Sequence, residues 1–246
     1  MESTNPVLAR GLAKSQSEYL SGERMTINGT INKTGMLLGI AAVTAAYPWS
    51  LVHASNFTAL NLPMWGGLIA GFIVAIAVSL KPMWAPWGAP IYAAAEGLVL
   101  GAISGMLNAQ YPGIAIQALI GTMGTLAVML LIYRSRIIEV NQRFRIGILA
   151  ATGGVALIYL VSMVLGFFGV VIPGIFGNGL IGIGFSLVVV CIAALNLVLD
   201  FDLIERGTKQ GAPKYMEWFG AFALMVTLVW LYLEILRLMA KFRSRD

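Results

Sequence analysis

Seven long runs of hydrophobic residues dominate the sequence, and short polar or Gly- and Pro-containing segments separate them. The runs lie at residues 35–53, 63–80, 88–108, 112–133, 146–170, 178–203 and 215–240. Each is near the length of about 20 residues that an α-helix needs to cross a bilayer. Hydrophobic residues occupy every face of the runs and do not alternate with polar ones, which excludes a transmembrane β-barrel. The pattern predicts an all-α, polytopic membrane protein with a seven-helix transmembrane bundle.

The composition supports this interpretation. Hydrophobic residues make up 59% of the 246-residue chain and charged residues only 11%. A soluble domain contains roughly 45–50% hydrophobic and 25% charged residues. A water-soluble enzyme and a disordered chain are therefore excluded.

Basic residues are distributed unevenly between the two sides of the predicted spans. The N-terminal segment and the second, fourth and sixth connections contain twelve Lys and Arg residues, whereas the other three connections contain none. The positive-inside rule therefore predicts a cytoplasmic N-terminus. The net charge of +5 then reflects topology and contact with anionic lipids, and nucleic acid is not expected as a partner.

Three parts of the chain are expected. Residues 1–30 are polar and should form a flexible cytoplasmic tail that is not a cleaved signal peptide. Residues 31–241 should form the transmembrane domain. Residues 242–246 should form a short basic tail.

The seventh run conflicts with the charge rule. Seven crossings place the C-terminus outside, yet the end of the chain is basic, with Arg237, Lys241, Arg243 and Arg245. Either the seventh segment lies inside the bundle or re-enters the membrane, or the rule fails at this helix. A segment with charges along its length is expected to be surrounded by protein and not by lipid.

Acidic residues inside the predicted spans are the candidate functional residues, because an ionised side chain at a helix centre costs roughly 2.5–3.5 kcal/mol to insert. The candidates for sensing ions or protons are Asp200, Glu217, Glu234, Asp202 and Glu96. Glu96 lies near the middle of the third run, with no cation within one turn. It is expected to be protonated or paired across helices, and a neutral interhelical hydrogen bond is the structural alternative.

Asp200 and Asp202 lie at the predicted end of the sixth run. Residues two positions apart on a helix point about 200° apart, so these side chains cannot face the same way. Asp202 can pair with Arg206 one turn later and is expected to be mostly solvated. Asp200 is then expected to face inward, near a helix C-terminus where the dipole disfavours a negative charge.

Glu217 and Glu234 lie at the start and in the second half of the seventh run. Glu217 follows a short connection and returns to about the depth of Asp200. The two carboxylates are expected to be neighbours that share a proton or bind Ca²⁺, and a helix-capping role is the alternative for Glu217. Glu234 lies about 25 Å further along the helix and can pair with Arg237.

Glycines recur every four residues in two of the runs. Gly97, Gly101 and Gly105 form such a series in the third run, and Gly67 and Gly71 in the second. Small residues at this spacing let transmembrane helices approach closely. We expect these glycines to serve packing.

No catalytic arrangement is visible in the sequence. His53 is the only histidine, the seventh run has no central lysine for a retinal Schiff base, and no phosphate-binding Walker lysine occurs. We therefore expect neither an enzyme nor a cofactor other than bound Ca²⁺.

Several segments resemble the Bax inhibitor 1 family, also called the transmembrane Bax-inhibitor-motif proteins. Residues 95–101 are similar to the family's Glu-Gly-x-x-Leu-Gly stretch in the third span. Residues 199–207 resemble its sixth-span ending, where a Gly follows the Asp by seven residues, and residues 231–237 resemble its seventh-span ending. Residues 25–35 resemble a bacterial, actinobacterial-type branch.

This resemblance implies six helices around a central, polar seventh helix and a pH-sensitive calcium leak. It also implies two aspartates, on spans six and seven, that bind a proton or a cation. Asp200 corresponds to the first. Matching Leu-Tyr-Leu at 231–233 makes Glu234 the second. Matching the C-terminal leucine and arginine pattern places Thr227 there, and Glu217 or Asp202 would then supply the acid.

We therefore expect a passive, pH-sensitive calcium leak gated by a carboxylate pair near the cytoplasmic ends of helices six and seven. Lys81 or a basic residue of the sixth connection could hold ionised Asp200. The alternatives are a Ca²⁺/H⁺ antiporter, which Glu96 favours, and a non-transporting regulator of membrane proteins or proteases. The expected partners are calcium ions, protons, the lipid bilayer and other membrane proteins, and the expected location is a bacterial cytoplasmic membrane.

Overall fold

The computed structural model describes residues 24–170 and 174–244, and seven long helices account for most of them. The helices are α2 (Ile27–His53), α3 (Phe57–Leu80), α4 (Ala85–Gln110), α5 (Ile114–Arg134), α6 (Gln142–Phe167), α7 (Leu180–Lys209) and α8 (Met216–Arg243). A short 3₁₀-helix, η1 (Pro82–Trp84), precedes α4. All seven helices are long and apolar enough to cross a membrane. The predicted all-α seven-helix membrane bundle is confirmed.

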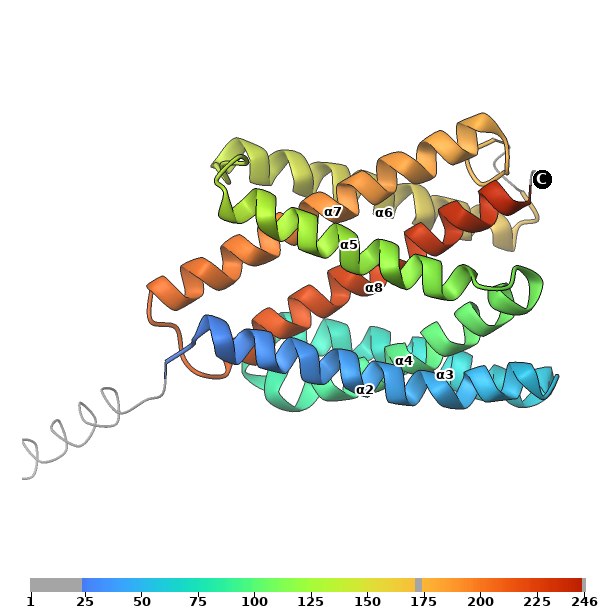
Figure 1. Cartoon of the computed structure of the whole chain (residues 1–246), viewed down its shortest axis with the longest axis horizontal. Coiled ribbons are helices and arrows are strands. Elements are labelled where there is room, and N and C mark those ends of the chain that lie inside the picture. Colours follow the sequence, from blue (N-terminus) through green and yellow to red (C-terminus); the bar gives the residue numbers. More distant parts are fainter. Residues whose placement is uncertain (1–23, 171–173, 245–246) are drawn as a thin grey trace, which may run out of the picture.

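Helix α8 occupies the centre of the bundle. It packs against α2, α4, α5 and α7, whereas α3 contacts mainly α4 and α6 contacts mainly α7. Figure 1 shows α8 running obliquely between the α2–α4 group and the α5–α7 group. The expected central seventh helix is therefore present.

The two ends of the bundle are named here after the ends of the chain. The N-terminal end contains the start of α2, the end of α7 and the start of α8, and the C-terminal end contains the end of α8 (Figure 1). Helix α8 is 28 residues long, which corresponds to about 42 Å. It crosses the whole bundle, so the re-entrant alternative for the seventh segment is wrong.

Polar residues determine where several helices begin. The side chains of Thr26, Asn56 and Asn141 accept hydrogen bonds from backbone N–H groups in the first turns of α2, α3 and α6. Helix α5 follows Gly113, whose φ of 86° is accessible to glycine at little cost. The short connection before it makes α4 and α5 antiparallel neighbours, as expected from its length.

Two helices extend well beyond the hydrophobic runs that predicted them. Helix α2 begins at Ile27 and not at residue 35, so the domain boundary expected at residue 30 falls inside it. Helix α7 continues to Lys209 and not to residue 203. Polar side chains at both ends are accommodated because they bond to other helices. Most of the expected tail over 1–30 lies outside the described residues.

The repeated glycines allow α4 to approach α2 and α3. A Cβ atom at Gly101 would lie 2.7 Å from the Cα atom of Ala45 on α2, and one at Gly67 would lie 2.6 Å from the carbonyl oxygen of Ala95 on α4. A Cβ atom at Gly97 would collide with Thr44. These distances are too short for any side chain, so the predicted packing role is confirmed.

Candidate functional site

Asp200 is a buried acidic side chain for which the described residues provide no cationic partner. It lies on α7, and its Oδ2 atom is buried without a hydrogen-bond partner within residues 24–170 and 174–244. The buried side chain of Thr227, on α8, is its polar neighbour. A buried carboxylate oxygen without a partner is costly, which marks Asp200 as a candidate for binding a proton or a cation.

The lengths of α7 and α8 explain why Thr227 is the neighbour. Asp200 precedes the end of α7 at Lys209 by nine residues, and Thr227 follows the start of α8 at Met216 by eleven. Both residues therefore lie about 15 Å into the bundle from its N-terminal end. The alignment that placed Thr227 at the second family position agrees with this geometry. Asp200 is also two and a half turns from the helix C-terminus, further than expected.

Glu217 lies in a separate cluster at the N-terminal end of the bundle. Its carboxylate is fully buried and forms an ion pair with Lys33 on α2. It also accepts hydrogen bonds from the backbone N–H and the hydroxyl of Thr26, at 2.9 and 2.8 Å. Gly29 leaves the space that this carboxylate fills. No contact joins Glu217 to Asp200 among the described residues, so the structure does not bring together the two carboxylates expected to be neighbours.

The residues that precede α2 lie over this cluster. The backbone N–H of Met25 donates to the carbonyl oxygen of Ala212, in the α7–α8 connection, at 2.8 Å. Lys214 in the same connection lies 3.7 Å from the Glu217 carboxylate. The start of α8 is therefore attached to the start of α2 by charged and neutral bonds. Sequence analysis offered no signal for these bonds, because 184 residues separate Lys33 from Glu217.

Asp202 is buried and not solvated as expected. Only 7% of the residue is exposed, and its carboxylate pairs with Arg145 on α6 and with Arg206 at 2.9 Å. The predicted pair with Arg206 is present. The expectation of a solvated side chain is wrong because α6 begins beside this part of α7 and brings Arg145 to the same carboxylate.

The third acidic residue of α7, Glu205, joins α7 to α5 at the same end of the bundle. Glu205 accepts hydrogen bonds from Tyr133 and from Arg136, the latter at 2.8 Å, and pairs with Lys209. This residue was not among the candidates. Asp202 therefore bonds the end of α7 to α6 through Arg145, and Glu205 bonds it to α5 through Tyr133.

Glu234 lies towards the C-terminal end, far from Asp200. It is buried and pairs with Arg237 at 2.9 Å, as predicted from their spacing. The hydroxyl of Tyr159 on α6 donates to the same carboxylate at 2.9 Å. Glu234 is therefore a bound ion-pair partner at one end of α8 and is not placed to share an ion with Asp200.

The basic residues at the end of α8 are also bonded. The buried ammonium group of Lys241 donates to the carbonyl oxygen of Gly182 at 2.9 Å and to the hydroxyl of Ser186 at 2.8 Å. Arg243 donates to the carbonyl oxygen of Pro112 and to the side chain of Gln117, at 3.3 and 3.1 Å. These bonds give Lys241 and Arg243 specific partners at the C-terminal end, whereas Arg245 lies outside the described residues.

Glu96 points from α4 towards α3. A Cβ atom at Gly71 on α3 would lie 3.1 Å from its Oε1 atom, and Tyr92, one turn earlier on α4, is its hydrogen-bonding neighbour. The described residues provide no cationic partner for Glu96. The expected pairing with another helix is therefore limited to close packing against the α3 backbone.

The basic residues suggested as partners of ionised Asp200 lie elsewhere. The ammonium group of Lys81 lies over the ring of Trp84, 4.7 Å from its centre. The basic residues of the sixth connection lie at the N-terminal end of the bundle. Arg206 pairs with Asp202, Lys209 pairs with Glu205, and Lys214 lies near Glu217. Within the described part of the chain, no group of three or more His, Cys, Asp or Glu residues is arranged to hold a metal ion. A cation at Asp200 would therefore complete its shell with hydroxyl, carbonyl or water oxygens.

Comparison with known proteins identifies one family. The family model described as "Bax inhibitor 1 like" matches residues 5–244, nearly the whole chain. No match was found among curated proteins or among solved structures. The match includes α7 and α8 and therefore both Asp200 and Thr227.

Proposed function

Because the chain belongs to the Bax inhibitor 1 like family of membrane proteins, we propose that it is a pH-sensitive, passive calcium leak controlled by Asp200. The observation that carries this proposal is the buried Oδ2 atom of Asp200, which has no hydrogen-bond partner among the described residues. A buried carboxylate between α7 and the central α8, with one oxygen atom left unbonded, is suited to bind a passing cation or a proton.

The proposed control rests on competition between two ligands of one carboxylate. Ionised Asp200 offers the hard oxygen atoms that Ca²⁺ prefers, and the hydroxyl of Thr227 offers another. Protonated Asp200 can instead donate a hydrogen bond to that hydroxyl. Acidification would therefore replace a cation site with a neutral contact between α7 and α8.

The proposal replaces the expected carboxylate pair with a single acid. Thr227 occupies the position facing Asp200, and Glu217 and Glu234 are bonded at opposite ends of α8. One titrating carboxylate gives a single protonation step, whereas two adjacent carboxylates titrate as a coupled pair. The number of protonation steps in the pH profile of calcium flux therefore distinguishes control by one carboxylate from control by a carboxylate pair.

The clusters at the N-terminal end would oppose passage through that end. The Lys33–Glu217 pair joins α2 to α8, and the Arg145–Asp202 pair joins α6 to α7. We propose that this end faces the cytoplasm, because the basic connections gather there. The similarity of residues 25–35 to bacterial members supports a bacterial cytoplasmic membrane.

The proposal is tested with purified protein in liposomes that contain a calcium dye and have no energy source. Calcium entry is recorded from pH 6 to pH 8 for the wild type, Asp200→Asn and Asp202→Asn. We expect Asp200→Asn to abolish the pH dependence. Asp202→Asn weakens the Arg145–Asp202 pair two residues away; it should change the size of the flux but preserve its pH dependence. Absence of flux at every pH, from protein shown to be folded and inserted, would overturn the leak.

A second arm of the same assay distinguishes a Ca²⁺/H⁺ antiporter from a passive leak. An imposed pH gradient with equal calcium on both sides drives net calcium uptake only if proton and calcium movements are coupled. A passive leak predicts no net uptake in this arm. Uptake that is lost in Glu96→Gln would assign the function to coupled exchange.

A further inference from the structure

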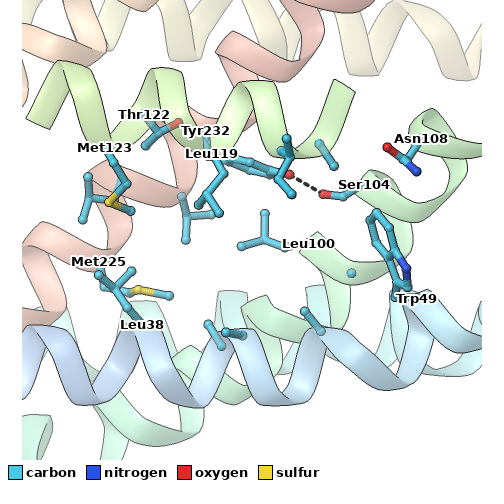
Figure 2. A pocket seen from close by; sticks show the side chains of 18 of the residues that line it. Leu38, Trp49, Leu100, Ser104, Asn108, Leu119, Thr122, Met123, Met225 and Tyr232 are labelled. Atoms are coloured by element: carbon cyan, nitrogen blue, oxygen red, sulfur yellow. Dashed lines mark hydrogen bonds between the residues drawn. The ribbon is translucent and has the colours of Figure 1, made fainter. Parts of the chain in front are cut away.

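A cavity of about 520 Å³ lies between α2, α4, α5 and α8. Figure 2 shows its lining, with Leu38 and Trp49 from α2, Leu100 from α4, Met123 from α5, and Met225 and Tyr232 from α8. The volume falls within the range of roughly 300–1,000 Å³ that is typical of small-molecule sites. The cavity is separate from Asp200, which does not line it.

The side chains that line the cavity offer few hydrogen-bond partners to a water molecule. Most lining side chains are aliphatic, aromatic or Met. The hydroxyls of Ser104 and Tyr232 bond to each other at 2.7 Å (Figure 2), and the hydroxyl of Thr122 donates to the carbonyl oxygen of Ala118 at 2.8 Å. A buried water needs two to four polar partners, and cavities without them stay dry. The favoured occupant is therefore a hydrocarbon.

The cavity opens sideways towards the region occupied by lipid. Helices α2 and α5 line opposite sides of it and do not pack extensively against each other (Figure 1). Ala42 on α2 and Ile116 and Leu119 on α5 line the cavity and are exposed, Ile116 by 64%. Because both helices cross the membrane, the medium at this opening is the acyl chains of the bilayer.

A polar rim lies at the C-terminal end of the bundle. Asn108 and Gly113 line that end of the cavity, and Arg243 bonds to the carbonyl oxygen of Pro112, next to Gly113. A guanidinium group at the membrane surface is suited to bind a phosphate. The cavity thus has an apolar interior and a cation at one end, which matches a phospholipid in charge and polarity.

We infer that this cavity binds one acyl chain of a phospholipid from the leaflet at the C-terminal end, with the headgroup phosphate near Arg243. The chain enters between α2 and α5 and fills the space against Met225 and Tyr232. Transfer from bilayer to protein brings no hydrophobic gain, because lipid tails are as apolar as Leu. The chain stabilises the complex by giving the lining atoms the dispersion contacts that an empty cavity lacks.

A photocrosslinking experiment tests the inference. The full-length protein is placed in nanodiscs that contain phosphatidylglycerol with a diazirine on one acyl chain, and labelled peptides are identified by mass spectrometry. Ala42→Phe fills the opening from an exposed position. Val43→Phe is the matched control, because Val43 is the next residue on α2, is 75% exposed and does not line the cavity.

We expect labels on Met123 and Met225 in the wild type and in Val43→Phe. In Ala42→Phe, labelling of these two residues should fall far below that of lipid-exposed Phe72 on α3, because Met225 is buried and reaches lipid only through the cavity. Uniform labelling of all exposed faces would mean annular lipid only and would overturn the site. So would labelling of Met225 that Ala42→Phe does not reduce, provided that the variant unfolds at the wild-type temperature.

The headgroup is tested separately. Arg243→Gln should reduce labelling by the phosphatidylglycerol probe and leave labelling by a diazirine-labelled diacylglycerol unchanged. Equal labelling by the phospholipid probe in the wild type and the variant would remove Arg243 from the site.

Discussion

Lys33 on α2 and Glu217 on α8 form an ion pair at the N-terminal end of the bundle, although 184 residues separate them in the chain. The Glu217 carboxylate is fully buried and is also bonded to the backbone and hydroxyl of Thr26. The central helix therefore begins at a charged group held by the first helix. This contact fixes the position from which α8 crosses the bundle.

Removal of the buried carboxylate should destabilise the protein strongly. We expect Glu217→Ala to cost about 3–5 kcal/mol, because Lys33 is left without its partner in a mostly buried position. Equilibrium unfolding in mixed micelles measures this cost. Glu205→Ala is the control, because its partners Arg136 and Lys209 are exposed, and it should cost about 1 kcal/mol or less. Equal costs for the two variants would contradict a special role for the Lys33–Glu217 pair.

A second acid at position 227 should change the shape of the pH profile. The wild type is expected to show one protonation step in calcium flux, because only Asp200 titrates at this position. Thr227→Asp should convert this step into two coupled steps, because adjacent carboxylates share protons. The liposome flux assay measures the profile, with Thr227→Val as the variant that adds no titrating group. A two-step profile already present in the wild type would show that a second acid acts with Asp200.

The buried Lys241 should stabilise the C-terminal end of the bundle. Lys241→Met leaves the hydroxyl of Ser186 and the carbonyl oxygens of Gly182 and Ile175 without their donor. An unpaired buried polar group costs about 1–3 kcal/mol. Hydrogen exchange should therefore accelerate at the start of α7, while Lys209→Met, on the exposed end of α7, should leave exchange there unchanged. Equal protection from hydrogen exchange at the start of α7 in both variants would mean that Lys241 does not stabilise this part of the helix.

The close approach of α4 to α2 should not tolerate a side chain at Gly101. A Cβ atom there would lie 2.7 Å from the Cα atom of Ala45, so Gly101→Val must push the helices apart. Overpacking of this kind costs about 1–3 kcal/mol or more. Gly39→Val makes the same change on α2 where nothing lies within 4 Å. Thermal unfolding should show that Gly101→Val lowers the unfolding temperature more than Gly39→Val does. Equal decreases for the two variants would contradict the packing role.

The hydrophobic runs were sufficient to predict the seven helices and their antiparallel order. A membrane-spanning segment must satisfy its backbone hydrogen bonds internally and must match the thickness of the bilayer, and both constraints act on local sequence. The same locality made the pairs Asp202–Arg206 and Glu234–Arg237 predictable, because helix geometry alone brings residues three or four apart together. The close-packing glycines were predictable for the same reason.

Only the tertiary structure decided which residue is the partner of each acid. The partners of Glu217, Asp202 and Glu234 on α2 and α6 come from packing between helices that are distant in sequence. The depth of Asp200 depended on polar turns at the end of α7 that hydropathy did not assign to the helix. Those extra turns place Thr227, and not an acid, beside Asp200. Hydropathy reports how long a segment can stay in lipid, whereas the neighbours of a buried charge depend on how helices pack around α8.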